Sequence, residues 1–222
     1  MIWNSVFVFV VIDLGVFGIP VLPGSSSSKI MLTIDKEWNS RPVNHPPIYL
    51  SLKWQPGDTF VTFEVDAPFF DDPPAPDGPV GKPFPQLWDY EVAEIFFLGA
   101  DEKYLEVEVS PHGQHLLLLL NGTRNMVKDE LDMDYTATID RSQSSWKGVA
   151  KIPLSYFPVG TNRLNAYAIH GSGTNRIYQS LYPAPEGKHE NPDFHRLEYF
   201  QAFDFNNLVK DQSDVGKFWD TL

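Results

Sequence analysis

The sequence predicts an all-β fold, an antiparallel sandwich of about ten strands with long loops and little helix. Short apolar runs alternate with a period of two residues from residue 32 onward, as in strands that bury one face. The 19 prolines and 15 glycines lie between these runs and mark turns. The 222 residues are enough for one large domain with a substantial core.

The first predicted element is a hairpin. In residues 48–54 the apolar side chains fall on one face of a strand, and residues 61–65 repeat the alternation. Pro56 and Gly57 between them supply a turn. A long loop over residues 67–87 follows, rich in proline and acid, and loops of this length are often functional.

The next strands are predicted at residues 92–98, 104–109 and 116–120. Five consecutive leucines, 116–120, indicate a strand that is buried on both faces. In residues 104–109 the alternation predicts that Leu105, Val107 and Val109 face the core and that Tyr104, Glu106 and Glu108 face outward.

Five later segments complete the predicted sandwich. Strands are expected at residues 135–139, 146–152, 163–170, 177–182 and near 200–205. A helical turn is expected at 153–156, whereas residues 126–132 fit either a helix or a loop.

The N-terminal segment differs from the rest of the chain. Residues 1–24 are apolar but interrupted, no Lys or Arg precedes Lys29, and residues 23–28 read as a linker. Two interpretations remain, an atypical export signal or an extension outside the domain, and we favour the extension. The expected organisation is then an extension at 1–30, a sandwich at 31–207 and a tail at 208–222. It places the protein in the cytoplasm, or outside the cell if residues 1–24 act as a signal peptide.

The charge and the cysteine count exclude several kinds of function. The 29 acidic and 17 basic residues give a net charge of −12, which makes nucleic acid and anionic membranes poor partners. A neutral or cationic ligand is compatible with this charge. The absence of cysteine excludes disulfides, thiolate metal sites and cysteine nucleophiles. Nothing in the composition indicates an oligomeric state.

Three segments of the sequence carry a resemblance to a known family. They are LWDYEVAEIFF at 87–97, YLEVEVSPHG at 104–113 and PDFHRLEYF at 192–200. Together they resemble the uncharacterised family named for open reading frame 33 of human chromosome 4. The resemblance runs from about residue 31 to residue 207, and such proteins start where Met31 lies.

A more distant resemblance is to family 9 carbohydrate-binding modules. It rests on the spacing of Trp88, Glu91 and Glu94 before a strand that ends in Ile-Phe, and on Tyr182 before a proline. The resemblance implies a β-sandwich that clamps a sugar between two aromatic faces, with Trp88 and Tyr182 as platforms and Glu94 as a hydroxyl acceptor. One position departs from the pattern, because Glu108 stands where those modules place an arginine.

The chemistry of the residues agrees with a sugar site but leaves alternatives open. Pyranose faces pack on aromatic rings, and carboxylates accept hydrogen bonds from hydroxyls. Trp88 lies at a loop–strand junction, where it is either such a platform or a core residue. Glu94 shares a strand face with apolar residues, so it needs a partner, either a ligand or a salt bridge to Arg124 or Arg176.

The predicted function is a non-catalytic carbohydrate-binding-like module whose ligand is a saccharide or another small polar molecule. The candidate ligand-binding residues are Trp88, Glu91, Glu94, Tyr182, His170, Arg124 and Arg176. One alternative is a small-molecule hydrolase using Glu94, His112 and His170. Another is a protein-interaction sandwich in which the loop 67–87 contacts the partner.

Metal binding is a weaker hypothesis, and no cofactor is predicted. His112, His115, His170 and His195, with Asp193, have the ligand chemistry for zinc but lack the spacing of a helical zinc motif. The loop acids Asp71, Asp72, Asp101 and Glu102 are the candidates for calcium, although they lack the EF-hand register.

Overall fold

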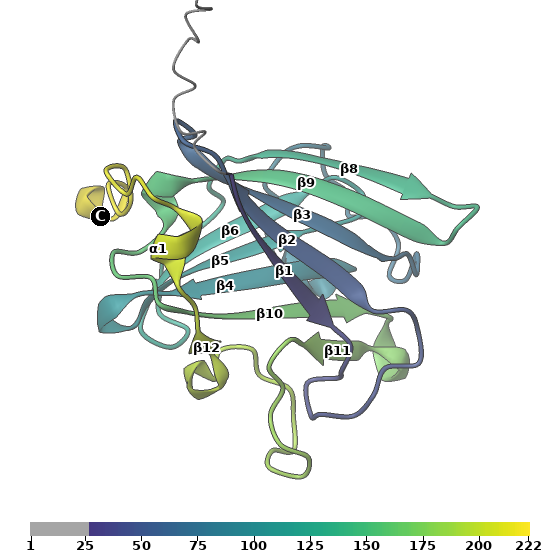
Figure 1. Cartoon of the computed structure of the whole chain (residues 1–222). Helices are drawn as coiled ribbons and strands as arrows, with labels where there is room; N and C mark the ends of the chain where they lie inside the picture. Colours follow the sequence, from purple (N-terminus) through teal and green to yellow (C-terminus); the bar gives the residue numbers. More distant parts are fainter. Residues whose placement is uncertain (1–26) are drawn as a thin grey trace, which may run out of the picture.

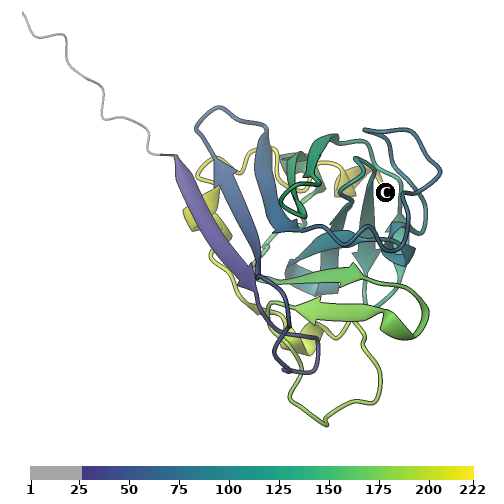
Figure 2. The same ribbon diagram turned by 90° about the vertical axis from the view of Figure 1, so that its right-hand side faces the viewer.

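The computed structural model describes residues 27–222, which fold into two antiparallel sheets packed face to face (Figures 1 and 2). The first sheet has five strands in the order β1-β2-β3-β9-β8. Their bounds are β1 Ser28–Ile34, β2 Ile48–Trp54, β3 Phe60–Pro68, β8 Asp134–Asp140 and β9 Ser145–Pro153.

The second sheet has seven strands in the order β11-β10-β4-β5-β6-β7, with β12 pairing to β10 beside β11. Their bounds are β4 Val92–Leu98, β5 Lys103–Val109, β6 His115–Asn121, β7 Met126–Lys128, β10 Arg163–His170, β11 Ile177–Ser180 and β12 Gln201–Ala202. The chain crosses from one sheet to the other between β3 and β4, so the loop 67–87 bridges the two layers.

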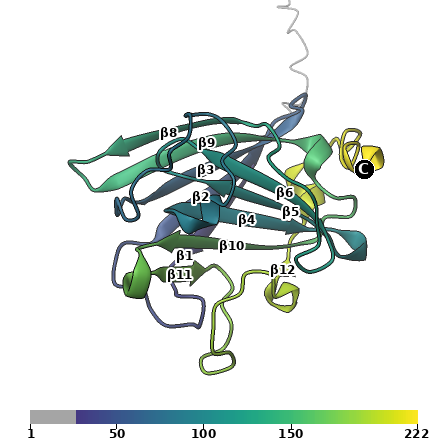
Figure 3. The same cartoon turned by 180° about the vertical axis from the view of Figure 1, so that it is seen from behind.

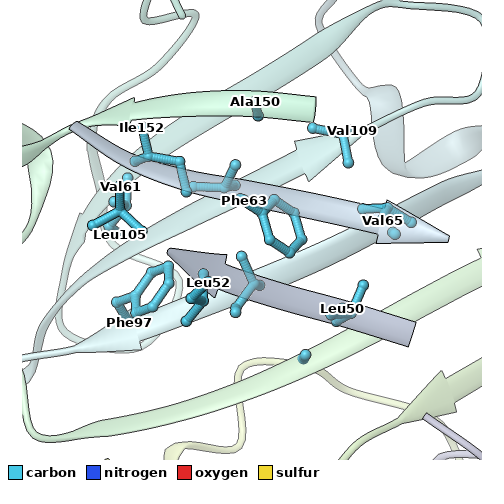
Figure 4. Close-up of a cluster of buried hydrophobic side chains, with 14 of the residues drawn as sticks. Leu50, Leu52, Val61, Phe63, Val65, Phe97, Leu105, Val109, Ala150 and Ile152 are labelled. Atoms are coloured by element: carbon cyan, nitrogen blue, oxygen red, sulfur yellow. The ribbon is translucent and has the colours of Figure 1, made fainter. Parts of the chain in front are cut away.

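The main core lies between the sheets, where the period-two pattern of each strand places its apolar residues (Figure 4). Leu50, Leu52 and Phe63 project from the five-stranded sheet, and Phe97 and Leu105 meet them from the seven-stranded sheet. All five side chains are fully buried. Their burial accounts for the pairing of the two layers.

A second apolar cluster covers the outer face of the seven-stranded sheet, the face directed away from the core. It is built from alternate residues of β4, β5, β6 and β10, together with residues of the segment 192–200, which follows β11. Figure 3 views the molecule from this side. Because the outer face is covered, strands of this sheet are buried on both faces, as the five leucines of β6 predict.

The short helices and the C-terminal segment complete the domain. The helical turns are η1 Leu87–Asp89, η2 Ala100–Glu102, η3 Leu154–Tyr156, η4 Gly173–Asn175, η5 Leu197–Tyr199, α1 Phe205–Leu208 and η6 Trp219–Thr221. Leu208 and Val209 are fully buried in the main core, so the predicted tail at 208–222 packs on the sandwich. No helix in residues 27–222 is long and apolar enough to cross a membrane.

The fold confirms the predicted all-β sandwich and the β2–β3 hairpin, and it corrects several details. Strand β1 begins at Ser28, so residues 28–30 belong to a strand instead of the extension. Residues 1–26 lie outside the described residues. Residues 126–132 begin with β7 instead of a helix. Glu106 and Glu108 face outward as predicted, but they are not exposed, because the outer face of the sheet is covered.

Candidate functional site

The outer face of the seven-stranded sheet carries a groove of about 330 Å³. Its floor is formed by apolar residues of β4, β6 and β10, namely Phe96, Leu118, Leu120 and Ile169. Residues Pro192–His195 form one wall, Trp88 and Tyr178 line it from η1 and β11, and Arg124 and Met126 contribute from the segment after β6. We call this cavity the outer groove.

Two glutamates line the outer groove, and a third lies next to them. Glu94 on β4 is paired with Glu108 on β5, and the neighbouring pair is Phe96 with Glu106. Alternate residues share a face, so the three carboxyl groups lie together on the outer face of two adjacent strands. Their exposed fractions are 1% for Glu94, 4% for Glu106 and 0% for Glu108. Only Glu94 and Glu106 reach the groove wall.

The carboxyl groups of this trio lack protein donors. Within residues 27–222, Oε1 of Glu94, Oε2 of Glu106 and both oxygens of Glu108 are buried without a hydrogen-bond partner. Such groups are costly to keep unless something outside the protein satisfies them. These three carboxyl groups therefore have oxygens that can still accept hydrogen bonds, and they lie beside the outer groove.

Burial changes the ionisation of all three carboxyl groups. It raises the pKa of Glu106 to about 8, against the opposing effects of the adjacent Glu108 side chain and the charge of Arg124. Burial, and then the charge of Glu106, raise the pKa of Glu94 well above its ordinary value. The pKa of Glu108 is raised in the same way, by burial and then by Glu94 and Glu106. At neutral pH Glu106 therefore keeps its proton.

The two arginines near the outer groove are engaged elsewhere. Arg176 donates to the backbone oxygens of Trp88 and Asp89, the latter at 2.9 Å, and to the hydroxyl of Tyr178 at 3.0 Å. Arg124 pairs with Asp193 through a contact of 2.7 Å. Neither is within salt-bridge distance of Glu94 in the described chain, so the predicted structural salt bridge to that carboxylate is wrong.

Aromatic side chains form the rim of the outer groove. Trp88 is 38% exposed, although most large apolar residues of the domain are buried. Phe194 also lines the groove and stacks on Tyr167, with ring centroids 4.0 Å apart and planes at 9°. Its ring also meets Tyr178 edge to face, with centroids 6.0 Å apart. The rim thus combines one accessible indole with a ring that is fixed by its neighbours.

His195 completes the wall and is itself held by hydrogen bonds. Its Nδ1 lies 2.8 Å from the hydroxyl of Tyr104, and its backbone N–H donates to Asp193 at 2.9 Å. Burial, and then the charge of Arg124, lower the pKa of His195 to about 4, so the ring is neutral at physiological pH. The wall residues are therefore preorganised and carry little net charge of their own.

Comparison with curated proteins identifies the family. The chain is 50% identical to the zebrafish (Danio rerio) UPF0462 protein C4orf33 homolog over 194 residues, which cover 82% of this chain and 94% of that protein. It is 49% identical to the human (Homo sapiens) UPF0462 protein C4orf33 over 183 residues, covering 81% and 90% of the two chains. The chain belongs to the UPF0462 family. No family model matches it.

A solved structure shares the fold of this UPF0462 chain. It is that of a proposed carbohydrate-binding protein from Bacteroides uniformis, with a TM-score of 0.54 and 15% sequence identity. The match covers 79% of this chain and 86% of the other. At this identity the similarity establishes the sandwich architecture.

Two of the predicted site residues, Glu91 and His170, lie outside the outer groove of the UPF0462 chain. Glu91 is buried and accepts hydrogen bonds from the backbone N–H groups of Phe70, at 3.2 Å, and Asp71, at 3.0 Å. His170 stacks on Phe70, with ring centroids 3.5 Å apart, and its Nδ1 is 3.1 Å from the amide of Gln179. Both residues hold the start of the loop 67–87 against the sheet.

Tyr182, the second predicted platform, also lies outside the outer groove. Its backbone N–H donates to Oδ1 of Asn165 at 3.0 Å, and its ring lines a separate recess of about 10 Å³ beside Trp38. Trp88 and Tyr182 therefore line different cavities, which share Asp193 and Phe194. The aromatic residue that lines the outer groove from the segment 192–200 is Phe194.

The predicted metal ligands do not converge. No group of three His, Asp or Glu side chains in residues 27–222 is arranged to hold a metal ion. Asp71 instead pairs with Arg141 at 2.7 Å, and Asp72 accepts from Ser172 at 2.7 Å. His112 lies 3.9 Å from Asp71, in a different part of the sheet from the groove that Glu94 lines. Glu94, His112 and His170 therefore do not share one site, as the hydrolase hypothesis requires.

Sequence reasoning identified Trp88, Glu94, Arg124 and Arg176 near the outer groove, and it missed Glu106, Tyr178 and the segment 192–195. The signal for Glu106 was present. The neighbouring strands 92–98 and 116–120 are apolar on both faces, so a carboxylate between them on β5 had to be covered as well. The segment 192–195 has no such signal, because its position depends on how the loop after β11 returns across the sheet.

Proposed function

We propose that the outer groove binds a saccharide and that the chain is a non-catalytic carbohydrate-binding-like module. The observation that carries this proposal is the pairing of an accessible indole, Trp88, with two buried carboxyl groups, Glu94 and Glu106, whose oxygens lack donors within residues 27–222. A carboxyl group supplies hydrogen bonds to hydroxyls, and an indole supplies a flat apolar face for a sugar ring.

The dimensions and the scaffold support the same proposal. A cavity of about 330 Å³ is within the usual range of small-ligand sites. It lies on a rigid sheet, and its rim is fixed by hydrogen bonds from Arg176 to the backbone of Trp88 and Asp89. The protein from Bacteroides uniformis, which is proposed to bind carbohydrate, has the same sandwich architecture.

Screening on a glycan array tests the proposal, with the full chain and the variant Trp88→Ala compared side by side. We expect specific glycans to be retained by the natural chain and lost by the variant, because the ring face is removed. Both proteins should melt within about 2 °C of each other, since an exposed side chain contributes little to stability.

The matched control is Trp38→Ala. Trp38 lies in the recess beside Tyr182, outside the outer groove. If Trp38→Ala abolishes glycan binding and Trp88→Ala does not, the site is the recess and the proposal is wrong. Retention of no glycan by the natural chain would also contradict it.

A further inference from the structure

The outer groove is lined by carboxyl groups that the rest of the protein does not supply with donors. Among the described residues, Glu94 and Glu106 line the groove, each has one buried oxygen without a hydrogen-bond partner, and both oxygens of the adjacent Glu108 are in the same condition. The arginines that could donate are occupied, Arg124 by Asp193 and Arg176 by backbone oxygens and Tyr178. Glu106 keeps its proton at neutral pH and so supplies one donor, but the acceptor positions of the three carboxyl groups outnumber it, and a ligand rich in donors therefore fits the groove best.

Neutral hydroxyls supply this need poorly. Each hydroxyl brings one donor together with acceptor lone pairs that need donors in return. An ammonium group brings three donors and no acceptor, and it also carries a positive charge that stabilises an adjacent carboxyl group once that group ionises. Desolvated carboxylates gain most from a partner of opposite charge.

The surroundings of the groove fit a cationic group as well. Trp88 at the rim offers a π-face, to which cations are attracted. The protein as a whole carries a net charge of −12, which attracts cations and repels anions. These features are independent of the oxygens inside the groove, and they favour the same kind of ligand.

We infer that the saccharide bound in the outer groove carries a protonated amine, so that an amino sugar is preferred to the neutral sugar of the same shape. This inference rests on the proposed saccharide binding and specifies its substrate class. The amine lies against Glu94 and Glu106, and Glu108 exchanges a proton with them. Binding of the cation drives a carboxyl group of the trio to ionise, so that a proton leaves for solvent while the ammonium stays protonated.

Calorimetric titration of the full chain with three β-1,4-linked tetrasaccharides tests the inference. They have the same backbone and differ only at the second carbon of each ring, which bears an amine, an N-acetylamine or a hydroxyl. The titrations contain a metal chelator and about 0.15 M salt, which screens exposed charges, and the pH is mildly acidic so that the amine is protonated. We expect the amine to bind at least about ten-fold more tightly than either neutral analogue.

The variants Glu94→Gln and Glu106→Gln should remove this preference, whereas Glu198→Gln should keep it. Glu198 is exposed and does not line the groove, so its substitution removes an acidic side chain without touching the site. A preference that survives in the groove variants would reflect general attraction to the acidic surface and would overturn the inference.

Two further outcomes separate the inference from the proposed function. If the N-acetyl or hydroxyl tetrasaccharide binds as tightly as the amine, the inference is wrong and saccharide binding stands. If none of the three binds, the inference is wrong and the glycan array alone decides the proposed function.

A second measurement does not depend on the variants. The natural chain is titrated in two buffers of different ionisation enthalpy, which reports the protons released on binding. The amine should release protons from the carboxyl trio, and absence of release on amine binding would overturn the inference.

Discussion

Glu91 and Glu94 lie three positions apart at the start of β4, and both are almost fully buried. Glu91 accepts hydrogen bonds from the backbone N–H groups of Phe70 and Asp71 and so fastens the loop 67–87. Glu94 faces the outer groove, and its Oε1 has no donor within residues 27–222. Burial alone therefore does not distinguish a structural carboxylate from a binding one, and the distinction lies in whether the protein supplies the partner.

Glu106 differs from Glu91 in the same way as Glu94 does, because one of its oxygens has no donor within residues 27–222. Burial raises the pKa of Glu91 to about 7, against the opposing hydrogen bonds from Phe70 and Asp71. Burial raises the pKa of Glu106 to about 8, where the opposing groups are Glu108 and Arg124. A buried carboxyl group with a raised pKa lowers the stability of the fold, so we expect the retention of Glu106 to be connected with function.

Replacing Glu91 with leucine should produce the largest loss of stability. The substitution leaves the N–H groups of Phe70 and Asp71 without their acceptor, and we expect a cost of about 2–4 kcal/mol in the free energy of unfolding. Urea unfolding measures it. Glu91→Gln serves as control, because its amide oxygen still accepts and most of the stability should remain. Equal losses in the two variants would contradict a hydrogen-bonding role.

The same substitution at Glu108 should have the opposite sign. Leucine removes a buried carboxyl group and leaves no protein donor among residues 27–222 without its acceptor, so we expect a gain of about 1–3 kcal/mol. The gain is measured by urea unfolding under the same conditions. A loss comparable to that of Glu91→Leu would mean that Glu108 is a structural residue and would break the contrast.

The pH dependence of stability separates the two regions in a single protein. A carboxyl group with a raised pKa keeps its proton in the folded state after the unfolded chain has lost it, so stability falls as pH rises from about 4.5 to the folded pKa. We expect the melting temperature to fall by about 3–6 °C between pH 5 and pH 8. Glu91→Gln should flatten the part below pH 7, and Glu106→Gln the part that continues to pH 8. A melting temperature that is flat or rises over this range would contradict the raised pKa values.

Arg124→Met should have the smallest effect. The ion pair between Arg124 and Asp193 is largely exposed on the arginine side, and such pairs contribute about 0–1 kcal/mol. Thermal melts at neutral pH check this. A loss above about 2 kcal/mol would show that Arg124 compensates the groove carboxylates, which would weaken the claim that they await a ligand.

Most of the fold could be predicted from the sequence because period-two alternation reports which face of a strand is buried. It located β2, β4, β9 and β10 closely and most of the others approximately, but it did not predict β1 or β7. For β5 it assigned the inward and outward faces correctly but did not indicate that the outward residues, such as Glu106, are buried. Alternation shows which residues of a strand are polar, but these residues are exposed only where no other part of the chain covers that face of the strand.

The candidate site could be predicted only in part. Trp88 and Glu94 were identified because they lie on or beside one strand, where local pattern and family resemblance both apply. Tyr182 was misplaced, and Phe194 was missed, because their positions depend on the path of the long segment between β11 and β12. That path is set by tertiary contacts such as the stacking of Phe194 on Tyr167, which sequence spacing does not encode.

Carbon-13 NMR of the glutamate carboxyl groups in the full chain tests the central claim most directly, that the groove carboxyl groups are left for a ligand while Glu91 is held by the protein. In the free protein, the signal of Glu106 should titrate near pH 8 and that of Glu91 near pH 7. Addition of the amine-bearing tetrasaccharide should shift the signals of Glu94 and Glu106, lower the titration midpoint of Glu106, and leave Glu91 unchanged. A Glu106 signal that titrates near its ordinary value of 4.5 in the free protein, or a ligand that shifts Glu91 instead, would contradict the account.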